Sequence, residues 1–160
     1  MFKPNFIFKT FLDITPEFLR DNNIKAVLLD VDNTLTYAHR TKKLRDGAVE
    51  WFETMRENGV GLIVLSNAEP KRAAAFGESV GLPIIGGSAK PLPFGYLKAA
   101  KKLRLKRREL LMVGDQIFTD TLGARALGIK AALVTDITPE DGWSFKLRRK
   151  LEKIILKDVR

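Results

Sequence analysis

The chain lacks cysteine altogether and contains a single histidine, His39. Without cysteine there can be no disulfide, no thiolate metal site and no cysteine nucleophile. One histidine also rules out most histidine-based catalysis. Any chemistry that the protein performs must therefore depend mainly on carboxylates and hydroxyls.

Long apolar runs, internal repeats and low-complexity tracts are missing as well. No run approaches the roughly 20 apolar residues of a membrane-spanning helix. Pro4, Asn5 and Lys9 interrupt the N-terminal segment before the apolar core of a signal peptide could form. With 160 residues, 45% of them apolar, the chain should fold as one domain over residues 1–160. We therefore expect a cytoplasmic globular protein.

Acidic residues are scarce relative to basic ones, since 19 Asp and Glu face 28 Lys and Arg, a net charge of +9. This charge favours an anionic partner, which could be a phosphorylated substrate, a nucleic acid or an anionic membrane surface. Basic side chains are concentrated in residues 98–108 and 146–160. Each run is equally compatible with an ordinary solvated helix face.

Short runs rich in Val, Ile and Leu alternate with helical patterns along the chain. Such runs are typical of strands that are buried on both faces, and the predicted strands are 26–29, 61–65, 83–85, 110–113 and 131–134. Helices are expected after Thr15 and near 48–59, 70–80, 93–103 and 120–127. The pattern predicts an α/β fold, a three-layer Rossmann-like domain with a five-stranded, mainly parallel sheet. Its core should span about 24–135, with a basic C-terminal helix at about 144–158.

Two carboxylates follow the first of these strands, in the sequence Asp30-Val31-Asp32-Asn33-Thr34. Ligands of such sheets bind beyond the carboxyl ends of the strands. Two neighbouring carboxylates there would repel each other unless they share a cation or a proton. Mg²⁺ prefers oxygen ligands and keeps room for phosphate oxygens. The motif therefore predicts a magnesium site for phosphate chemistry, with a coincidental polar turn as the alternative.

Polar residues also follow three later strands, as Ser66-Asn67, Lys90-Pro91 and Gly114-Asp115 with Asp120. Each has a simple structural explanation when it is taken alone. Ser66-Asn67 could cap a helix, Lys90 could be a surface lysine, and Asp120 could be an acid in the first turn of a helix. Together, a hydroxyl, an ammonium group and carboxylates beside Asp30 favour a phosphoryl-transfer site.

The four ordered motifs DVDNT, SN, KP and GDQIFTD resemble those of the haloacid dehalogenase-like phosphatase superfamily, over residues 24 to about 135. The resemblance implies that Asp30 attacks phosphorus and forms an aspartyl-phosphate. Asp32 would protonate the leaving oxygen and then take a proton from water. Lys90 would offset negative charge on the nucleophile and the phosphoryl group.

The same resemblance assigns the binding residues. Phosphate would be bound by Thr34, Ser66, Asn67 and Lys90. Mg²⁺ would be held by the Asp30 carboxylate, the backbone carbonyl of Asp32 and the Asp115 carboxylate. Asp120 would support these ligands from behind without binding the metal itself.

Members of the superfamily carry lids between the first and second or the second and third motifs, and this chain has little room for either. Residues 35–65 and 67–89 are nearly used up by the predicted helices and strands. We expect no substantial cap and an open site, unless an oligomeric neighbour provides a lid. An open site can accept the end of a large or membrane-embedded substrate.

Finer details resemble one cap-less family, the phosphatidylglycerophosphate phosphatases. The resemblance lies in Pro4 with an apolar N-terminal segment, Ile24-Lys25 before the first motif, Gly114-Asp115-Gln116 with Thr119-Asp120, Gly123 and a basic C-terminal helix. Ala68 and residues 144–148 depart from the family pattern. The resemblance implies that the substrate is a phospholipid headgroup and that the protein contacts the membrane peripherally.

Several alternatives remain open. The phenylalanines of residues 2–12 and the apolar residues of 147–155 could contact a membrane, or they could pack on the domain. The substrate could instead be a nucleic-acid end, a phosphoprotein or a small phosphorylated metabolite, and a non-catalytic phosphate-binding module is the least favoured reading. Nucleic acid is disfavoured because residues 98–108 contain no aromatic side chain for base stacking. His39 fits a surface residue better than a substrate contact.

Overall fold

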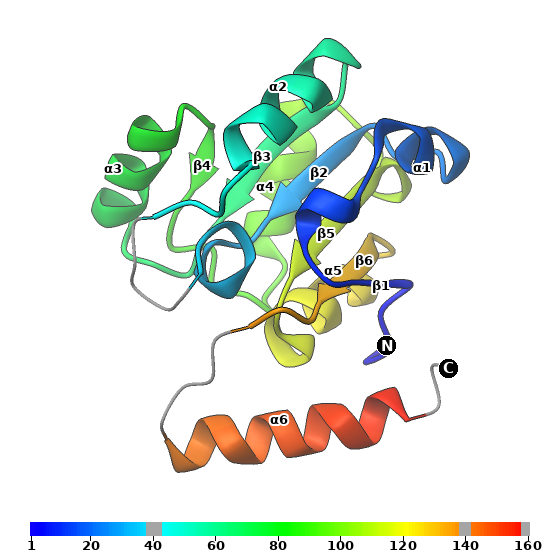
Figure 1. Cartoon of the computed structure of the whole chain (residues 1–160), viewed down its shortest axis with the longest axis vertical. Helices are drawn as coiled ribbons and strands as arrows, with labels where there is room; N and C mark the ends of the chain where they lie inside the picture. The colour runs from blue at the N-terminus through cyan, green and yellow to red at the C-terminus, as the bar shows by residue number, and fades with distance from the viewer. Residues whose placement is uncertain (38–42, 138–141, 158–160) are drawn as a thin grey trace.

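A six-stranded sheet forms the centre of the computed structural model, which describes residues 1–37, 43–137 and 142–157 (Figure 1). The spatial order of the strands is β1-β6-β5-β2-β3-β4, and every neighbouring pair is parallel. The strands are β1 (Phe6–Phe8), β2 (Ala26–Leu29), β3 (Gly61–Leu65), β4 (Ile84–Ile85), β5 (Leu110–Gly114) and β6 (Lys130–Val134). The predicted α/β class and parallel sheet are confirmed.

The helices follow the strands in the predicted alternation. They are α1 (Pro16–Asp21), α2 (Ala48–Glu57), α3 (Pro70–Val80), α4 (Phe94–Leu103), α5 (Leu122–Ala126) and α6 (Trp143–Leu156). Short turns η1 (Phe11–Asp13), η2 (Val31–Leu35), η3 (Arg107–Glu109) and η4 (Ile117–Thr121) complete the connections. As expected, Thr15 caps α1, since its hydroxyl oxygen accepts a hydrogen bond from the Phe18 N–H at 3.1 Å.

Helices pack on both faces of the sheet, so the three predicted layers are present. In β2, Val27 and Leu29 belong to the same buried cluster as Phe52 of α2. Leu28, between them, belongs to a second cluster with Tyr96 of α4. Because successive side chains of a strand point to opposite faces, the strand buries apolar groups on both sides and carries no polar residue before it ends.

The sheet has one strand more than the sequence predicts, because the N-terminal segment forms edge strand β1 beside β6, with Phe6 opposite Ala132. The rings of Phe6 and Phe8 pack edge-on against Phe18 of α1, with centroids 4.8 and 5.1 Å away. From the sequence alone, this segment could contact a membrane or cover the sheet edge; in the structure, residues 6–8 cover the edge. Three residues are too few to show the alternation that identifies a strand.

No large cap is present among the residues that the structure describes. Between β2 and β3 they form η2, an isolated bridge that pairs Thr36 with Leu44, and α2. Between β3 and Lys90 they form α3 and β4. His39 lies outside the described residues. No helix in the described ranges has the length and apolar character needed to cross a membrane.

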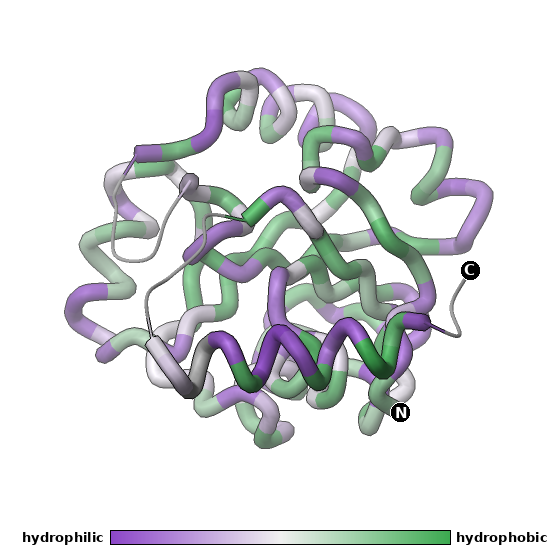
Figure 2. The backbone as a smooth tube through the Cα atoms, turned by 60° about the horizontal axis from the view of Figure 1, so that its bottom comes forward, coloured by the Kyte–Doolittle hydropathy of each residue, from purple (hydrophilic) through white to green (hydrophobic). Residues whose placement is uncertain are grey.

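Helix α6 is the predicted basic C-terminal helix, and it runs along the outside of the sheet-and-helix body (Figure 1). Hydrophobic and hydrophilic residues alternate along it (Figure 2). Leu147, Leu151 and Ile154 are exposed, and Trp143 is 80% exposed. Much of the apolar surface of α6 is therefore not buried in the core.

Candidate active site

Asp30 stands at the carboxyl end of β2, where the backbone leaves the sheet into turn η2. Its N–H donates to the Val113 carbonyl at 3.0 Å, which continues the pairing with β5. Buried Arg45 then fixes the turn, because its guanidinium donates to the carbonyls of Thr34 and Asn33, both at 3.0 Å. Arg45 therefore fixes the turn that begins immediately after Asp30 and carries Asp32.

Lys90 joins Asp30 to the loop after β5. Its ammonium nitrogen lies 2.7 Å from Asp30 Oδ1 and 2.7 Å from Asp120 Oδ1, and its side chain is 2% exposed. Burial by itself lowers the pKa of Lys90, but the carboxylates of Asp120 and Asp30 outweigh burial and raise that pKa above its usual range. Lys90 is therefore a fixed cation in the site.

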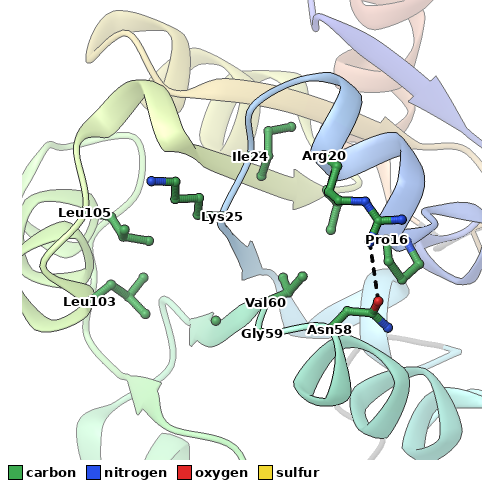
Figure 3. A pocket seen from close by; sticks show the side chains of 11 residues that line it. Pro16, Arg20, Ile24, Lys25, Asn58, Gly59, Val60, Leu103 and Leu105 are labelled. Carbon is green, nitrogen blue, oxygen red and sulfur yellow. Dashed lines mark hydrogen bonds between the residues drawn. The ribbon is translucent and has the colours of Figure 1, made fainter.

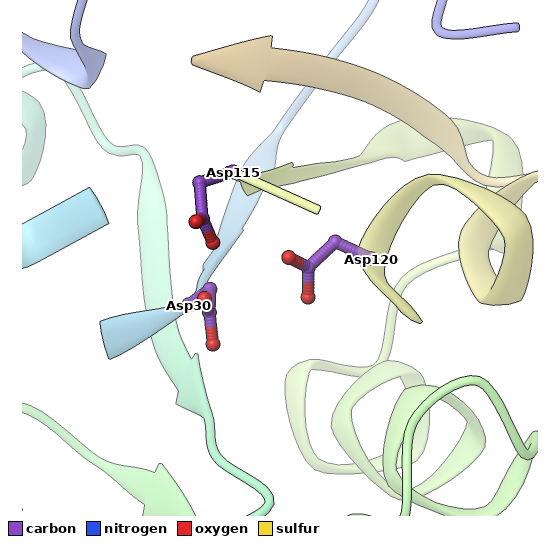
Figure 4. Close-up of side chains that lie close together, drawn as sticks. All are labelled: Asp30, Asp115 and Asp120. Atoms are coloured by element: carbon purple, nitrogen blue, oxygen red, sulfur yellow. The ribbon is translucent and has the colours of Figure 1, made fainter. Parts of the chain in front are cut away.

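Three carboxylates meet beside Lys90. One oxygen atom from each of Asp30, Asp115 and Asp120 lies within 4.8 Å of the other two. Asp30 and Asp115 follow the neighbouring strands β2 and β5, and Asp120 joins them from turn η4 (Figure 4). Burial and the charge of Asp30 raise the pKa of Asp120 to about 7, although Lys90 opposes the shift. Burial, Asp30 and Asp120 also raise the pKa of Asp115 well above its ordinary value. The negative charge of the three carboxylates is therefore not fully offset by the neighbouring cations.

The cluster fits a hard divalent cation. Asp115 Oδ1 is buried and has no hydrogen-bond partner in the described part of the chain. Both oxygens of Asp120 are engaged, Oδ1 by Lys90 at 2.7 Å and Oδ2 by the Gln116 N–H at 3.3 Å. Open carboxylate oxygens on Asp30 and Asp115, together with unbalanced charge, suit an ion that prefers oxygen ligands.

Gly114 lets Asp120 reach this position. A Cβ atom on Gly114 would lie 2.1 Å from Asp120 Oδ2 and 2.3 Å from Asp120 Cγ. Any side chain would therefore displace the carboxylate that holds Lys90. On the other side, the Tyr96 hydroxyl donates to the Thr119 carbonyl at 2.9 Å and fixes the turn before Asp120.

Ser66 and Asn67 follow β3 and tie Lys90 to the end of that strand. Asn67 Oδ1 accepts a hydrogen bond from the Lys90 N–H at 2.7 Å, and Asn67 Nδ2 donates to the Lys90 carbonyl at 3.1 Å. The Ser66 hydroxyl oxygen accepts from the Ala68 N–H at 3.0 Å. These contacts bring the second and third motifs together beside the first.

An open cleft of about 250 Å³ lies over the cluster. Its lining consists of Asp30, Asp32, Ser66, Asn67, Ala68, Arg72, Lys90, Gln116 and Thr119. Five predicted site residues thus line the cleft, and Asp115 and Asp120 lie in the carboxylate cluster with Asp30. Thr34 does not line it; the residue is 1% exposed, and its hydroxyl has no hydrogen-bond partner within the described ranges.

Three arginines of this region were not predicted from the sequence. Arg45 fixes turn η2, Arg149 of α6 contacts Asp115, and Arg72 of α3 lines the cleft. Arg72 is exposed and makes no ion pair or hydrogen bond with any residue of the described ranges. Arg72 follows Asn67 by five residues and lies in the first turn of α3, and this proximity to the second motif is the one local signal.

A second hollow, of about 390 Å³, lies where β2 and β3 begin, at the opposite end of the sheet (Figure 3). It is lined largely by apolar groups such as Leu103 and Leu105. Its cations are engaged, since Lys25 pairs with Glu109 at 2.9 Å and Arg20 donates to Asn58 Oδ1 at 3.5 Å. It holds no cluster of reactive side chains, so the carboxylate cleft is the candidate active site.

One protein family and two curated relatives are similar to this chain in sequence. The haloacid dehalogenase-like hydrolase family matches residues 37–128. The probable phosphatase YqeG of Bacillus subtilis is 34% identical over 158 residues, which cover 97% of this chain and 90% of the relative. The mitochondrial phosphatidylglycerophosphatase GEP4 of Saccharomyces cerevisiae is 29% identical over 150 residues, which cover 84% and 78% respectively.

Solved structures agree on the fold. The crystal structure of a 4-nitrophenylphosphatase from Thermotoga maritima superposes with a TM-score of 0.62, at 13% identity, over 74% of this chain and 88% of that one. At this identity the likeness concerns the fold alone. The family match spans more than half of the chain, and the Bacillus subtilis relative spans nearly all of it. The chain therefore belongs to the haloacid dehalogenase-like hydrolase family.

Proposed function

We propose that the protein is a Mg²⁺-dependent phosphatase that uses Asp30 as a covalent nucleophile and removes the terminal phosphate of phosphatidylglycerophosphate. The observation that carries this proposal is the position of Asp30. Its carboxylate is 15% exposed at the cleft, and Lys90 holds Oδ1 at 2.7 Å while Oδ2 has no hydrogen bond to any described residue. An oriented, partly exposed carboxylate beside a fixed cation suits attack on a phosphoryl group.

In the first step, an oxygen of Asp30 bonds to phosphorus while the bond between phosphorus and the substrate oxygen breaks. Asp32, which lines the same cleft, gives its proton to that leaving oxygen. In the second step, Asp32 takes a proton from water, the water oxygen bonds to phosphorus, and the bond to Asp30 breaks. Inorganic phosphate leaves, and both aspartates return to their starting states.

Three groups of the chain would hold Mg²⁺: the carboxylates of Asp30 and Asp115 and the backbone carbonyl of Asp32. When bound, the ion supplies positive charge that offsets the charge of the phosphoryl group. Lys90 remains paired with Asp30 and Asp120, and its ammonium group is a second positive charge beside the nucleophile. Ser66 and Asn67 line the cleft and would bind the phosphoryl group, whereas Thr34 is buried and does not line it.

Two features of the cleft favour a substrate larger than a simple phosphomonoester. No large cap covers the cleft among the described residues, so a headgroup attached to a membrane has access. Arg72 lines the cleft as a cation without a protein partner in the described ranges. Phosphatidylglycerophosphate carries a phosphodiester near its terminal phosphate, and Arg72 is suited to bind that second anion.

The surface of α6 supports contact with an anionic membrane. Its exposed apolar side chains are accompanied by Lys146, Lys150, Lys153 and Lys157. A basic residue near an anionic leaflet contributes about 1 kcal/mol to binding. The name of the yeast relative, a phosphatidylglycerophosphatase, supports the same substrate.

The first prediction compares substrates. Purified protein with Mg²⁺ should release phosphate from phosphatidylglycerophosphate in mixed micelles faster than from a sugar phosphate, a phosphopeptide or a 3′-phosphorylated oligonucleotide. Asp30→Asn should lower kcat by about 10³-fold or more, because the nucleophile is lost. Asp46→Asn, which alters an exposed aspartate outside the cleft, is the matched control.

The outcomes separate mechanism from substrate. Preference for another substrate with loss of activity in Asp30→Asn would keep the mechanism and remove the lipid assignment. Activity that survives in Asp30→Asn would overturn the mechanism itself.

The second prediction concerns pH and metal. Without metal, the pKa of Asp120 is about 7 in the folded protein against an ordinary value of 3.8. Between about pH 4 and 7 the folded protein binds a proton that the unfolded chain has released, so this group makes the free energy of unfolding fall as pH rises. Calorimetry should show a smaller decrease in Tm over this range for Asp120→Asn than for the wild type.

Mg²⁺ should raise the Tm of the wild type more at pH 7.5 than at pH 5, because the ion competes with protons for the carboxylates. Equal Mg²⁺ effects at both pH values, or a steeper loss in Asp120→Asn, would contradict this account.

The third prediction concerns Arg72. With the soluble deacylated headgroup and 4-nitrophenyl phosphate as substrates, Arg72→Gln should lower the ratio of their kcat/KM values by about tenfold, since a charge-assisted hydrogen bond contributes roughly 1.5–3 kcal/mol. Lys71→Gln removes a neighbouring exposed charge that does not line the cleft and should preserve the ratio. An unaltered ratio in Arg72→Gln would show that Arg72 does not bind the phosphodiester group of the substrate.

A further inference from the structure

Two polar residues of helix α6, Arg149 and Glu152, connect this helix to the candidate metal site. Most of the helix is exposed, but Glu152 is only 3% exposed and the Arg149 side chain is 16% exposed. These two residues lie one helical turn apart and face the loop that follows β5. They are therefore placed differently from the solvated basic residues around them.

Arg149 binds two oxygens of the same residue. Its Nη2 atom lies 2.7 Å from Asp115 Oδ2, and its Nη1 atom lies 2.7 Å from the Asp115 carbonyl oxygen. Because the guanidinium group is planar and rigid, this two-point contact fixes the carboxylate relative to its own backbone.

Glu152 completes the contact from behind. Its Oε2 atom accepts a hydrogen bond from Arg149 Nη1 at 2.8 Å, and its Oε1 atom accepts from the Ile117 N–H at 3.0 Å. The pair thus bridges the backbone on both sides of Gln116. A glutamate that orients the arginine and also holds the loop leaves Asp115 little freedom to turn.

The consequence concerns the two carboxylate oxygens of Asp115, which are not equivalent. Oδ2 is held by Arg149, whereas Oδ1 is buried without a hydrogen-bond partner in the described part of the chain. Burying a carboxylate oxygen without a partner is costly. The Asp115 carboxylate is part of the cluster with Asp30 and Asp120. A cation bound in that cluster would give Oδ1 the partner that it lacks.

We propose that Arg149 and Glu152 are positioning residues that direct Asp115 Oδ1 toward the metal, so that helix α6 forms part of the metal site. This inference rests on the proposed function, because it takes Asp115 as a ligand of the ion. It assigns the C-terminal helix a role in catalysis that is independent of any contact with a membrane.

The test measures metal binding without turnover. Mn²⁺ is added to the full-length protein, and free Mn²⁺ is followed by its EPR signal. Arg149→Lys keeps the charge but loses the two-point contact. Glu152→Gln keeps the size but turns its NH2 donor group toward either Arg149 or the Ile117 N–H, both of which need an acceptor. Each should raise the Kd for Mn²⁺ by about tenfold or more, as loss of residues that orient metal ligands commonly does.

The control variant is Lys150→Ala, which removes an exposed positive charge from the same helix and should change the Kd by less than about twofold. The double variant of Arg149 and Glu152 should bind Mn²⁺ no more weakly than the worse single variant, because the two residues act as one unit. Circular dichroism and Tm measurements identify any variant that fails to fold. If Glu152→Gln or the double variant does not fold, the conservative Arg149→Lys variant still tests the inference.

An unchanged or lower Kd in Arg149→Lys and Glu152→Gln would overturn the inference, and a lower Kd would show that Arg149 competes with the metal for Asp115. If the wild type binds no Mn²⁺ and releases no phosphate, the proposed function falls as well. If the wild type binds and turns over normally and the variants match it, the inference alone is wrong.

Discussion

The repulsion among Asp30, Asp115 and Asp120 is the constraint on which the rest of the site depends. An oxygen of each lies within 4.8 Å of the others. Burial, together with the charge of the neighbouring carboxylates, raises the pKa of Asp115 and Asp120. Lys90 offsets part of the negative charge from the Asp30 and Asp120 side, and Arg149 offsets part from the Asp115 side. The charge that remains is what a divalent cation would neutralise, and the proposed chemistry follows from that.

The parallel sheet makes such a cluster possible. Strands β2, β3 and β5 are neighbours, and their carboxyl ends bring residues from widely separated parts of the chain to one edge. The strands themselves are apolar on both faces, so the polar groups begin only where the sheet ends. Gly114 permits the close approach of Asp120, and Asn67 fixes the backbone of Lys90.

The sequence predicted the parts of this arrangement that leave a local pattern. Asp30, Asp32, Ser66 and Asp115 each follow a strand of four or five residues that is recognisable from its apolar run, so their convergence could be derived from the topology. Lys90 follows the two-residue strand β4, and the order of the motifs identified it instead. Edge strand β1 could not, because Phe6–Phe8 is too short to show a period. The contacts of Arg45 with η2 span 11 and 12 residues, and the contact of Arg149 with Asp115 spans 34. Nothing in the local sequence distinguishes these arginines from solvated ones.

The claim that Asp30 becomes phosphorylated can be tested by trapping the intermediate in Asp32→Asn. Nitrophenolate needs no acid to leave, so 4-nitrophenyl phosphate should still phosphorylate Asp30, whereas hydrolysis lacks its base and the intermediate should accumulate. Acid quenching and borohydride reduction convert a phosphorylated aspartate into homoserine, and tandem mass spectrometry can locate it in the tryptic peptide of residues 26–40. The account predicts homoserine at position 30 and one equivalent of nitrophenol in a burst. Homoserine at another aspartate, or a burst that leaves Asp30 unmodified, would contradict it.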